Sequence, residues 1–422
     1  WGDGGGARAI FRDFLDSAVT AGHGVDVKNL YNLYIYFWRW ALWKVFEHET
    51  SSGSGVVSFI SASSYLDGDA FCGMREHMRR LCDEIWILDL GGEGRGTRKS
   101  DNVFAIQTPV AIAIAVRAGK TKKAQPAAVH YARVEGRREA KLAALDDIQD
   151  FAGVKWQDCS DEWQAPFRPA GRGQYFRWPL LIDLMPWQHS GAQFKRTWPI
   201  CADKETLGAR WRALLRSRDM ASAFKETRDR KVNRECPPLV EMDKRQKPLA
   251  ELPKTSAAPK IERYGYRLFD RQWILADNRL GDFLRPDLWR EHGERQVYLT
   301  SLFSQPLAAG PALTACHYIP DLDHFRGSYG AKAAIPLFRD ASASHANILP
   351  GLLRMLNRAF QRKVTPEDLL AYVYGALAQP AFTARYAKEL ETRELRVPIT
   401  KSAALFAKVR DAGARLLWLH TY

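Results

Sequence analysis

The stretch from residue 55 to residue 117 constrains the fold more than any other part of the chain. It opens with a short apolar run, 56–60, which lacks apolar–polar alternation and is typical of a strand buried on both faces. Residues 71–82 carry apolar side chains three and four apart, which predicts an amphipathic helix. A second apolar run follows at 84–90. Strand, helix and strand at this spacing predict a βαβ unit, and therefore an α/β domain.

The continuation of this stretch predicts a truncated domain. Residues 91–100 form a polar, glycine-rich turn, and 103–116 are rich in Val, Ile and Ala. Because Thr108 and Pro109 interrupt that second segment, it is expected to form two short strands or a hairpin. The whole is typical of the end of an α/β domain whose earlier strands are missing. Since the chain opens on Trp1 rather than methionine, we expect a fragment of a longer polypeptide.

The net charge points to a polyanionic partner. The 422 residues leave room for two or three domains, and the formal charge is +14. Segment 195–271 holds 20 Lys and Arg against 11 Asp and Glu, so most of the surplus is local. A general solubility role is the alternative. A local surplus favours a binding surface, and nucleic acid is the simplest partner.

The cysteines and the hydropathy pattern indicate a reducing, cytoplasmic compartment. The six cysteines are scattered without a C-x-x-C pair, and no apolar segment has the length of a membrane span. We therefore expect neither a membrane anchor nor a metal centre. Asp321 and Asp323 resemble a metal-binding pair, but no E-x-K partner follows them.

Changes in composition predict four regions. Residues 1–150 contain the α/β stretch, and 151–235 form a Trp-rich and basic connecting region. Residues 236–262 hold five prolines and many lysines, which predicts a mobile linker. Residues 263–422 form a last region with a helical C-terminus. One of its helices is expected at 366–378, with Thr365 as its cap.

Sequence blocks in a fixed order then suggest a family. The first blocks are NLYIYFWRWALWKVFE, GVVSFISASSYLDG, AFCGMREHMRR, EIWILDLGG and NVFAIQTPVAI. Further blocks are WQAPF (163–167), QFKRTWPI (193–200), YRLFDRQW (266–273), HYIPDLDH (317–324) and LAYVYGALAQPAFTARYA (370–387). Their order and spacing resemble adenine-N6 DNA methyltransferases of the type ISP and Eco57I-like restriction–modification group. The resemblance covers most of the chain.

This resemblance implies a fold and a cellular role. The expected fold is α/β, a partial Rossmann-like class I methyltransferase sheet followed by a mixed α+β target-recognition domain with a helical C-terminus. In this scheme 1–150 is the C-terminal half of the catalytic domain and 263–422 is the target-recognition domain. The expected partner is double-stranded DNA, in a bacterial restriction–modification or phage-defence system. Other domains of the same polypeptide, or defence-system subunits, are further candidate partners.

Two family motifs are absent, which limits the expected chemistry. Neither the F-x-G-x-G cofactor loop nor the N/D-P-P-Y/F tetrapeptide occurs, and both normally precede the part present here. The resemblance thus implies that S-adenosylmethionine is bound mainly by residues upstream of Trp1. Methyl transfer needs the target amine aligned with the methyl group by hydrogen-bond acceptors that the tetrapeptide supplies. This chain is therefore expected to be inactive by itself.

The resemblance also implies a part in a flipped-base pocket. An adenine must leave the duplex before methylation, and aromatic rings hold flipped bases by stacking. In the family, an aromatic residue near the hairpin after the second strand is a candidate for this role. Phe104 has that position, beside Gln107 and Thr108. The alternative is that Phe104 is a core residue at a strand end.

Residues at the end of the first strand are ambiguous. Segment 61–65 follows that strand, where ligands bind in open α/β sheets. Ser63 or Ser64 could equally cap a following turn. Asp67 and Asp69 are interpreted as turn residues.

Polar residues in the second half are candidates for DNA contacts. Candidates for phosphate contacts are Lys195, Arg196, Arg210, Arg212, Arg216 and Arg218. Arg267, Arg271 and Gln272 have side chains that can pair bidentately with guanine or adenine edges. An ion pair between Arg267 and Asp270 is the structural alternative.

Two other functions stay open at this point. The chain could be a non-catalytic DNA-binding specificity module that works with a separate catalytic chain. It could also be half of an RNA methyltransferase, because its many aromatic side chains would suit unpaired bases.

Overall fold

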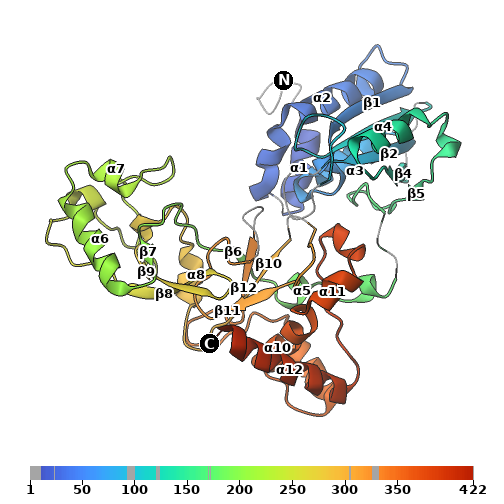
Figure 1. Ribbon diagram of the computed structural model, residues 1–422. Helices are drawn as coiled ribbons and strands as arrows, with labels where there is room; N and C mark the ends of the chain where they lie inside the picture. The colour runs from blue at the N-terminus through green and yellow to red at the C-terminus, as the bar shows by residue number, and fades with distance from the viewer. Residues whose placement is uncertain are drawn as a thin grey trace. The chain divides into compact units, whose positions relative to one another are not determined.

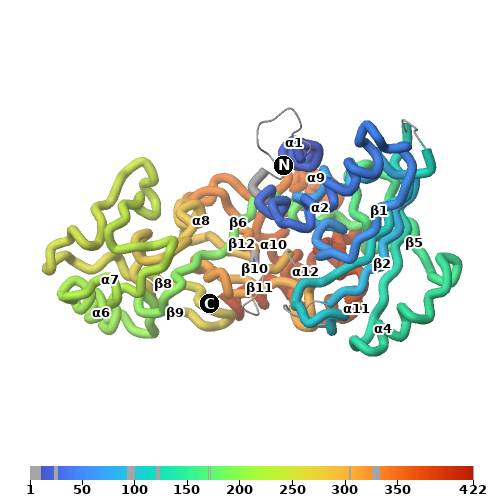
Figure 2. The backbone as a smooth tube through the Cα atoms, turned by 90° about the horizontal axis from the view of Figure 1, so that it is seen from above, coloured from blue at the N-terminus to red at the C-terminus, as the bar shows by residue number. Residues whose placement is uncertain are grey.

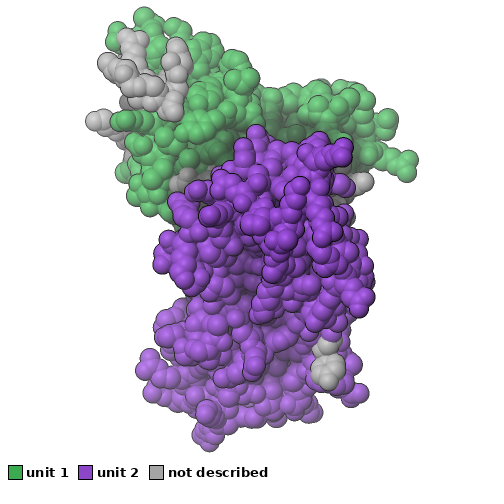
Figure 3. Space-filling view, turned by 90° about the vertical axis from the view of Figure 1, so that its left-hand side faces the viewer, with its two compact units in different colours: residues 1–171 green, residues 172–422 purple. Residues whose placement is uncertain are grey.

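A computed structural model describes residues 11–22, 24–92, 100–119, 124–169, 171, 173–303, 306–325 and 332–421. Most of the predicted glycine-rich turn, 93–99, lies outside the described residues. The chain divides into two compact units, 1–171 and 172–422 (Figure 3). The region boundaries at 150, 235 and 262 stay predictions.

Unit 1 is a five-stranded sheet with helices on both faces (Figure 1). Its strands are β1 (Gly55–Ala62), β2 (Glu84–Gly91), β3 (Val110–Arg117), β4 (Ala128–Arg133) and β5 (Gln157–Asp158). Its helices are α1 (Arg12–Thr20), α2 (Leu33–Leu42), α3 (Cys72–Leu81) and α4 (Arg138–Asp146). Short helical turns are η1 (Gly24–Tyr31), η2 (Trp43–Glu47), η3 (Ser63–Leu66), η4 (Asp69–Phe71) and η5 (Phe151–Gly153).

The strand order modifies the predicted βαβ unit. The order is β1-β3-β2-β4-β5, and β3 is antiparallel to both of its neighbours. β1 and β2 are therefore parallel, as predicted, but β3 lies between them. The prediction of two short strands or a hairpin for 103–116 is wrong, because the only strand in this described segment is β3. Pro109 lacks the N–H that would continue the ladder toward residue 103.

The two faces of this sheet are covered to different extents. On one face α1, α2 and α3 bury Trp38, Met74 and Met78 against the alternate strand residues Ile85 and Ala113. On the other face a smaller cluster covers only part of the sheet, with the segment around α4. The sheet therefore has one closed and one partly open face.

β1 lies at the open edge of the described sheet. Among the described strands it pairs only with β3, and Val56 and Ile60 are 57% and 52% exposed. The prediction that this strand is buried on both faces is therefore wrong, because no described element covers its second face. The apolar stripe predicted on the α2 segment is likewise only half buried. Trp38 is enclosed, whereas Leu33 and Phe37 face outward.

Unit 2 contains two smaller sheets and most of the helices. Its strands are β6 (His189–Ser190), β7 (Ile200–Cys201), β8 (Ile261–Arg267), β9 (Asp270–Leu275), β10 (Tyr298–Leu302), β11 (Thr314–Cys316) and β12 (Lys332–Pro336). Its helices are α5 (Leu181–Leu184), α6 (Lys204–Arg216), α7 (Met220–Phe224), α8 (Pro286–Glu291), α9 (Leu352–Phe360), α10 (Pro366–Leu377), α11 (Pro380–Arg385) and α12 (Ala403–Thr421). The helical turns are η6 (Tyr175–Arg177), η7 (Leu249–Glu251), η8 (Asn278–Leu280) and η9 (Glu389–Thr392).

A backbone crossing in unit 2 links β8 to the segment that follows β11. The four-stranded sheet has the order β11-β10-β12-β6, and the other has the order β7-β9-β8. Gly265 of β8 donates its N–H to the Ile319 carbonyl oxygen at 3.0 Å, and its carbonyl accepts from Asp321 N at 2.8 Å. A side chain at position 265 would collide with Cys316, so the close approach requires glycine.

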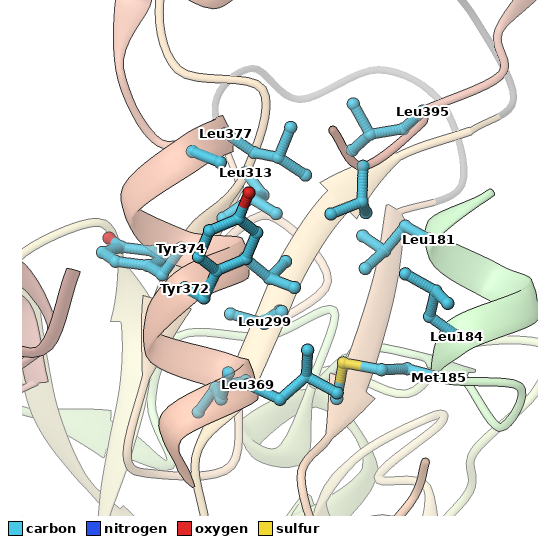
Figure 4. Packing of buried hydrophobic residues seen from close by; sticks show 14 of the residues in the cluster. Leu181, Leu184, Met185, Leu299, Leu313, Leu369, Tyr372, Tyr374, Leu377 and Leu395 are labelled. Carbon is cyan, nitrogen blue, oxygen red and sulfur yellow. The ribbon is translucent and has the colours of Figure 1, made fainter. Parts of the chain in front are cut away.

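The largest core of unit 2 surrounds α10. Leu369, Tyr372 and Leu377 of this helix lie opposite Leu299 and Leu313 of the four-stranded sheet region (Figure 4). The predicted helix start is confirmed by a capping box. In it, Thr365 Oγ1 accepts from Asp368 N at 3.1 Å, and the Asp368 carboxylate accepts from Thr365 N at 3.0 Å.

The segment predicted to be a mobile linker, 236–262, is folded into unit 2. Leu239 and Leu249 are buried in the core beside α6, and Cys236 is enclosed as well. Gln246 N donates to the Cys236 carbonyl oxygen at 3.0 Å. Proline content suggested an extended linker, but the few apolar residues between the prolines anchor the segment to the core.

Candidate nucleic-acid interface

The predicted base-stacking residue lies at the carboxyl edge of the unit 1 sheet. The loop 100–109 connects β2 to β3, and Asn102 holds it in shape. Asn102 Nδ2 donates to the Thr108 carbonyl oxygen at 2.7 Å, and its Oδ1 accepts from Phe104 N at 2.9 Å. Phe104 is 46% exposed, so the core interpretation of this residue is wrong. A ring on a hydrogen-bonded loop is available for stacking.

The serines at the end of β1 are held by α2. Trp38 Nε1 donates to Ser61 Oγ at 3.1 Å, and the Tyr34 and Ser64 hydroxyls lie 2.6 Å apart. No side chain caps η3, so neither serine has the capping role considered above. Burial raises the pKa of Tyr34 to about 12, so its hydroxyl keeps its proton at neutral pH. These contacts fix the start of η3 beside the sheet edge.

A buried carboxylate network, which sequence reasoning missed, lies at the same edge. The Asp89 side chain at the end of β2 is fully buried. It accepts hydrogen bonds from Tyr131 Oη at 2.7 Å, Gly91 N at 2.9 Å and Arg168 Nη2 at 3.1 Å. Arg168 also forms an ion pair with Asp67 at 3.2 Å, so Asp67 is more than a turn residue. An aspartate inside an otherwise apolar strand could have signalled such a network, because a buried charge needs partners.

Two buried arginines of α3 anchor the neighbouring loop. Arg75 donates to the carbonyl oxygens of Tyr65 and Gly68 at 3.1 and 2.7 Å. Arg79 donates to the Ala165 carbonyl oxygen at 2.7 Å, within the WQAPF block. Burial lowers the pKa of Arg79 to about 10, so it stays charged at neutral pH. Guanidinium groups thus bind backbone carbonyls here and position the loop that precedes Arg168.

In unit 2, the structure removes one predicted phosphate contact. The Arg196 side chain is fully buried, and it donates to the Asp282 carboxylate and the Leu280 carbonyl oxygen, each at 2.7 Å. It is a structural ion pair and cannot reach a phosphate without unfolding this region. Lys195 is more exposed, but its ammonium group pairs with Asp229 at 2.8 Å.

The remaining candidates on α6 and just after it differ in how they are held. Arg210 donates to the carbonyl oxygens of Trp198 and Ile200 at 3.1 and 2.9 Å, which fixes its guanidinium group. Arg212, Arg216 and Arg218 are exposed. A surface cavity of about 330 Å³ lies between Trp198, Arg210 and Arg216. It presents one fixed and one exposed guanidinium, which is an arrangement suited to an anion.

The β8–β9 hairpin holds the three candidates for base-edge contacts. Arg267 forms an ion pair, but its partner is Asp321 and not the predicted Asp270: Arg267 Nη1 lies 2.8 Å from Asp321 Oδ1. Asp270 instead accepts a hydrogen bond from Gln272 Nε2. Arg271 makes a long hydrogen bond of 3.4 Å to the His420 carbonyl oxygen. Arg271 and Gln272 are half-buried at the hairpin surface.

An acidic cluster in unit 1 has metal-ligand spacing. Among the residues that the structure describes, one group could offer three ligand atoms within 4.8 Å of one another, from Asp13, Glu47 and His77. The Arg39 guanidinium, however, lies between the two carboxylates, 2.5 Å from each. The cluster is therefore a buried arginine with two counter-charges.

A second cavity opens on the partly covered face of the unit 1 sheet. Its volume is about 310 Å³, and its wall includes Trp86, Ile112, Ile114, Leu145 and Phe151. The wall is mostly apolar, and it continues the face on which the β1 side chains are exposed. Such a surface is suited to packing against protein, not to binding a phosphate.

The fold and these surfaces define a mixed α/β protein with a basic second unit, and comparisons with known proteins give the family. Residues 183–422 match the family described as "Type ISP C-terminal specificity domain". Because the match covers more than half of the 422 residues, the chain belongs to this family. No curated protein sequence matches the chain. Within the described residues, no helix is both long and apolar enough to cross a bilayer.

Solved structures share the fold over nearly the whole chain. The ATP-dependent Type ISP restriction-modification enzyme LlaBIII bound to DNA has a TM-score of 0.67 at 17% identity, over 99% of this chain and 28% of that one. A nuclease-deletion mutant of the Type ISP restriction-modification enzyme LlaGI, in complex with a DNA substrate mimic, has a TM-score of 0.65 at 21% identity, over 98% and 33%. The cryo-EM structure of a DrdV–DNA complex has a TM-score of 0.63 at 21% identity, over 93% and 40%. The chain therefore spans well under half the length of these proteins.

Proposed function

We propose that this chain recognises a target sequence in duplex DNA as part of a restriction–modification enzyme. The match of residues 183–422 to a specificity domain is the observation that carries the proposal. The three solved structures named above, each of which contains DNA or a DNA substrate mimic, support it. The exposed arginines of α6 and the formal charge of +14 give the electrostatic basis for binding a phosphate backbone.

Unit 1 is proposed to be the end of the adenine-N6 methyltransferase catalytic domain, with a Rossmann-like sheet. Three features support this: β1 and β2 are parallel, β1 has an open edge, and the adjoining apolar face is exposed. An open edge and an uncovered apolar face are what a sheet presents where it adjoins further strands and helices.

S-adenosylmethionine is the proposed methyl donor of the complete enzyme. Neither the F-x-G-x-G loop nor the N-P-P-Y tetrapeptide occurs in the 422 residues, so this chain does not supply the family's cofactor-binding motifs. The chain by itself is expected to transfer no methyl group, and its expected compartment is the bacterial cytoplasm.

The contacts proposed with DNA fall into two groups. Arg212, Arg216 and Arg218 are proposed to contact phosphates, because they are exposed on or just after α6. Arg271 and Gln272 on β9 are proposed to reach base edges. In unit 1, Phe104 is proposed to stack on the flipped adenine.

The test compares how tightly the 422-residue chain binds different nucleic acids. Affinities for a duplex, a single strand and a structured RNA are measured between about 50 and 200 mM salt. We expect the duplex to bind best, with log K falling linearly with log salt by about 0.9 for each phosphate contacted. A salt slope near zero, or tighter binding of structured RNA, would contradict the proposal.

A further inference from the structure

Helix α9, labelled in Figure 2, carries basic residues that are exposed and that are not among the DNA contacts proposed above. Arg354 and Arg358 lie one helical turn apart on its exposed side, and Arg362 and Lys363 follow the end of the helix. All four residues are exposed. None of them forms an ion pair with any residue that the structure describes.

The helix is anchored firmly beneath these charges. Leu352, Leu356 and Phe360 occur every fourth residue on the opposite side and are buried in the α10 core. At its end, Asn357 Oδ1 accepts from Val364 N at 2.6 Å, and Gln361 takes the left-handed conformation. The basic side chains therefore project from a fixed backbone, and their spacing is set by the helix.

Acidic residues are absent from the stretch of sequence that holds these charges. The sequence from 349 to 366 contains four basic residues and no Asp or Glu. The next acidic residues along the chain are already engaged, since Glu367 pairs with Arg295 and Asp368 pairs with Arg410 at 2.9 Å. The other described helices of unit 2 that carry Lys or Arg also carry an acidic residue, as α6 does with Glu205, or have one within four residues, as α11 does with Glu389.

Helix stability does not account for this arrangement. Cations near the last turn interact favourably with the helix dipole, which explains Arg358 and the residues after it. Arg354, however, lies in the first turn, where the dipole disfavours a positive charge. Arg354 and Arg358 are also like charges at i and i+4, which destabilises a helix by a few tenths of a kcal/mol. The pattern therefore points to an external polyanion.

We propose that Arg354, Arg358, Arg362 and Lys363 form a second phosphate-contact surface for duplex DNA, separate from the α6 arginines. The inference rests on the DNA-binding function proposed above. Arg354 and Arg358 lie about 6 Å apart along the helix axis, which matches a short segment of one DNA backbone, where phosphates recur about every 3.4 Å of duplex axis. Contacts to phosphates position the duplex without reading its sequence.

The test replaces all four residues by glutamine in the 422-residue chain (R354Q, R358Q, R362Q and K363Q). The matched control replaces four exposed cations of the C-terminal region, Lys388, Lys401, Lys408 and Arg415, by glutamine, which removes the same net charge. The salt slope of duplex binding is measured for both variants, with thermal unfolding as a check that both are folded.

The α9 variant is expected to lower the magnitude of the salt slope by about 2 to 4, because each lost phosphate contact accounts for about 0.9. Affinity should fall by the same factor for duplexes that contain the recognised sequence and for duplexes that lack it. A change in the salt slope no larger than that of the control overturns the inference. This is also the result expected if α9 binds an acidic protein surface instead of DNA. If the unaltered chain fails to bind duplex DNA, the proposed function itself fails.

Discussion

At the scale of single residues, burial decides which predicted contacts stay available to DNA. Arg196 and Arg216 have the same side chain and lie close in sequence. Arg196 is enclosed beside Asp282, whereas Arg216 faces solvent at the end of α6. Breaking the buried pair would leave an unpaired charge and cost about 3 to 5 kcal/mol, so only Arg216 can exchange water for phosphate.

Phe104 gives the prediction at this scale. If the complete enzyme is the methyltransferase proposed above, F104A should reduce its methylation roughly 5- to 150-fold, because stacking of a base on an aromatic ring contributes about 1 to 3 kcal/mol. It should also change the fluorescence of a 2-aminopurine placed at the target position, because the flipped base would lose its stacking partner. Methylation and fluorescence are measured on the same duplex.

Ile106 supplies the control for that measurement. It lies in the same loop and is about as exposed as Phe104, but it has no ring. I106A should stay within about twofold of the unaltered enzyme, since it removes no stacking surface. Equal losses in the two variants would mean that the loop, and not the Phe104 ring, matters.

At the scale of elements, the contact between α10 and α12 depends on glycine. Gly375 and Gly413 lie where the helices approach most closely. A Cβ on Gly375 would come within 2.5 Å of the Val409 carbonyl oxygen, and one on Gly413 would collide with the Ala371 carbonyl oxygen. Because both obstacles are backbone atoms, they cannot rotate away.

The G413A substitution is therefore expected to destabilise the chain by about 3 kcal/mol, the upper range for overpacking of a core. G208A in α6 is the matched control, because its Cβ would meet only the Arg212 side chain at 3.5 Å. That variant should be stabilised by about 0.5 to 1 kcal/mol through helix propensity. Urea unfolding of both variants measures the difference, and equal stabilities would refute the packing argument.

At the scale of the whole molecule, each hydrophobic core belongs to one unit. The α10 core begins with Tyr175 and Leu181, ahead of residue 183, where the match to the specificity domain starts. Tyr175 Oη donates to the Glu394 carbonyl oxygen, and Leu181 N donates to the Leu395 carbonyl oxygen at 2.8 Å. The folding unit is therefore longer than the matched region.

Two fragments test this boundary. Fragment 172–422 should unfold cooperatively, because it retains the complete cores of unit 2. Fragment 187–422 lacks Tyr175, Leu181, Leu184 and Met185, and each large buried side chain is worth about 2 to 5 kcal/mol. The free energy lost with these four side chains is therefore similar to the whole free energy of unfolding of a typical domain, about 5 to 15 kcal/mol. Near-ultraviolet circular dichroism should show native packing in the longer fragment only, and native spectra for both would contradict the boundary.

The sequence by itself determined the local elements of this protein. Apolar spacing predicted α3 and the strands on either side of it, and Thr365 with Pro366 predicted the start of α10. These signals are local, because periodicity and capping depend on residues within one or two turns. Family blocks along the chain also pointed to the Type ISP group, which the match to its specificity domain confirms.

Only the tertiary structure decided what these elements contact. The position of β3 between β1 and β2, the burial of Arg196 and the packing of 236–262 all depend on residues far apart in sequence. The Asp89 network brings together residues from 67 to 168, and no local pattern encodes that meeting. Burial and charge pairing are set by neighbours in space, so the sequence supplied the candidates and the fold determined which of them face solvent.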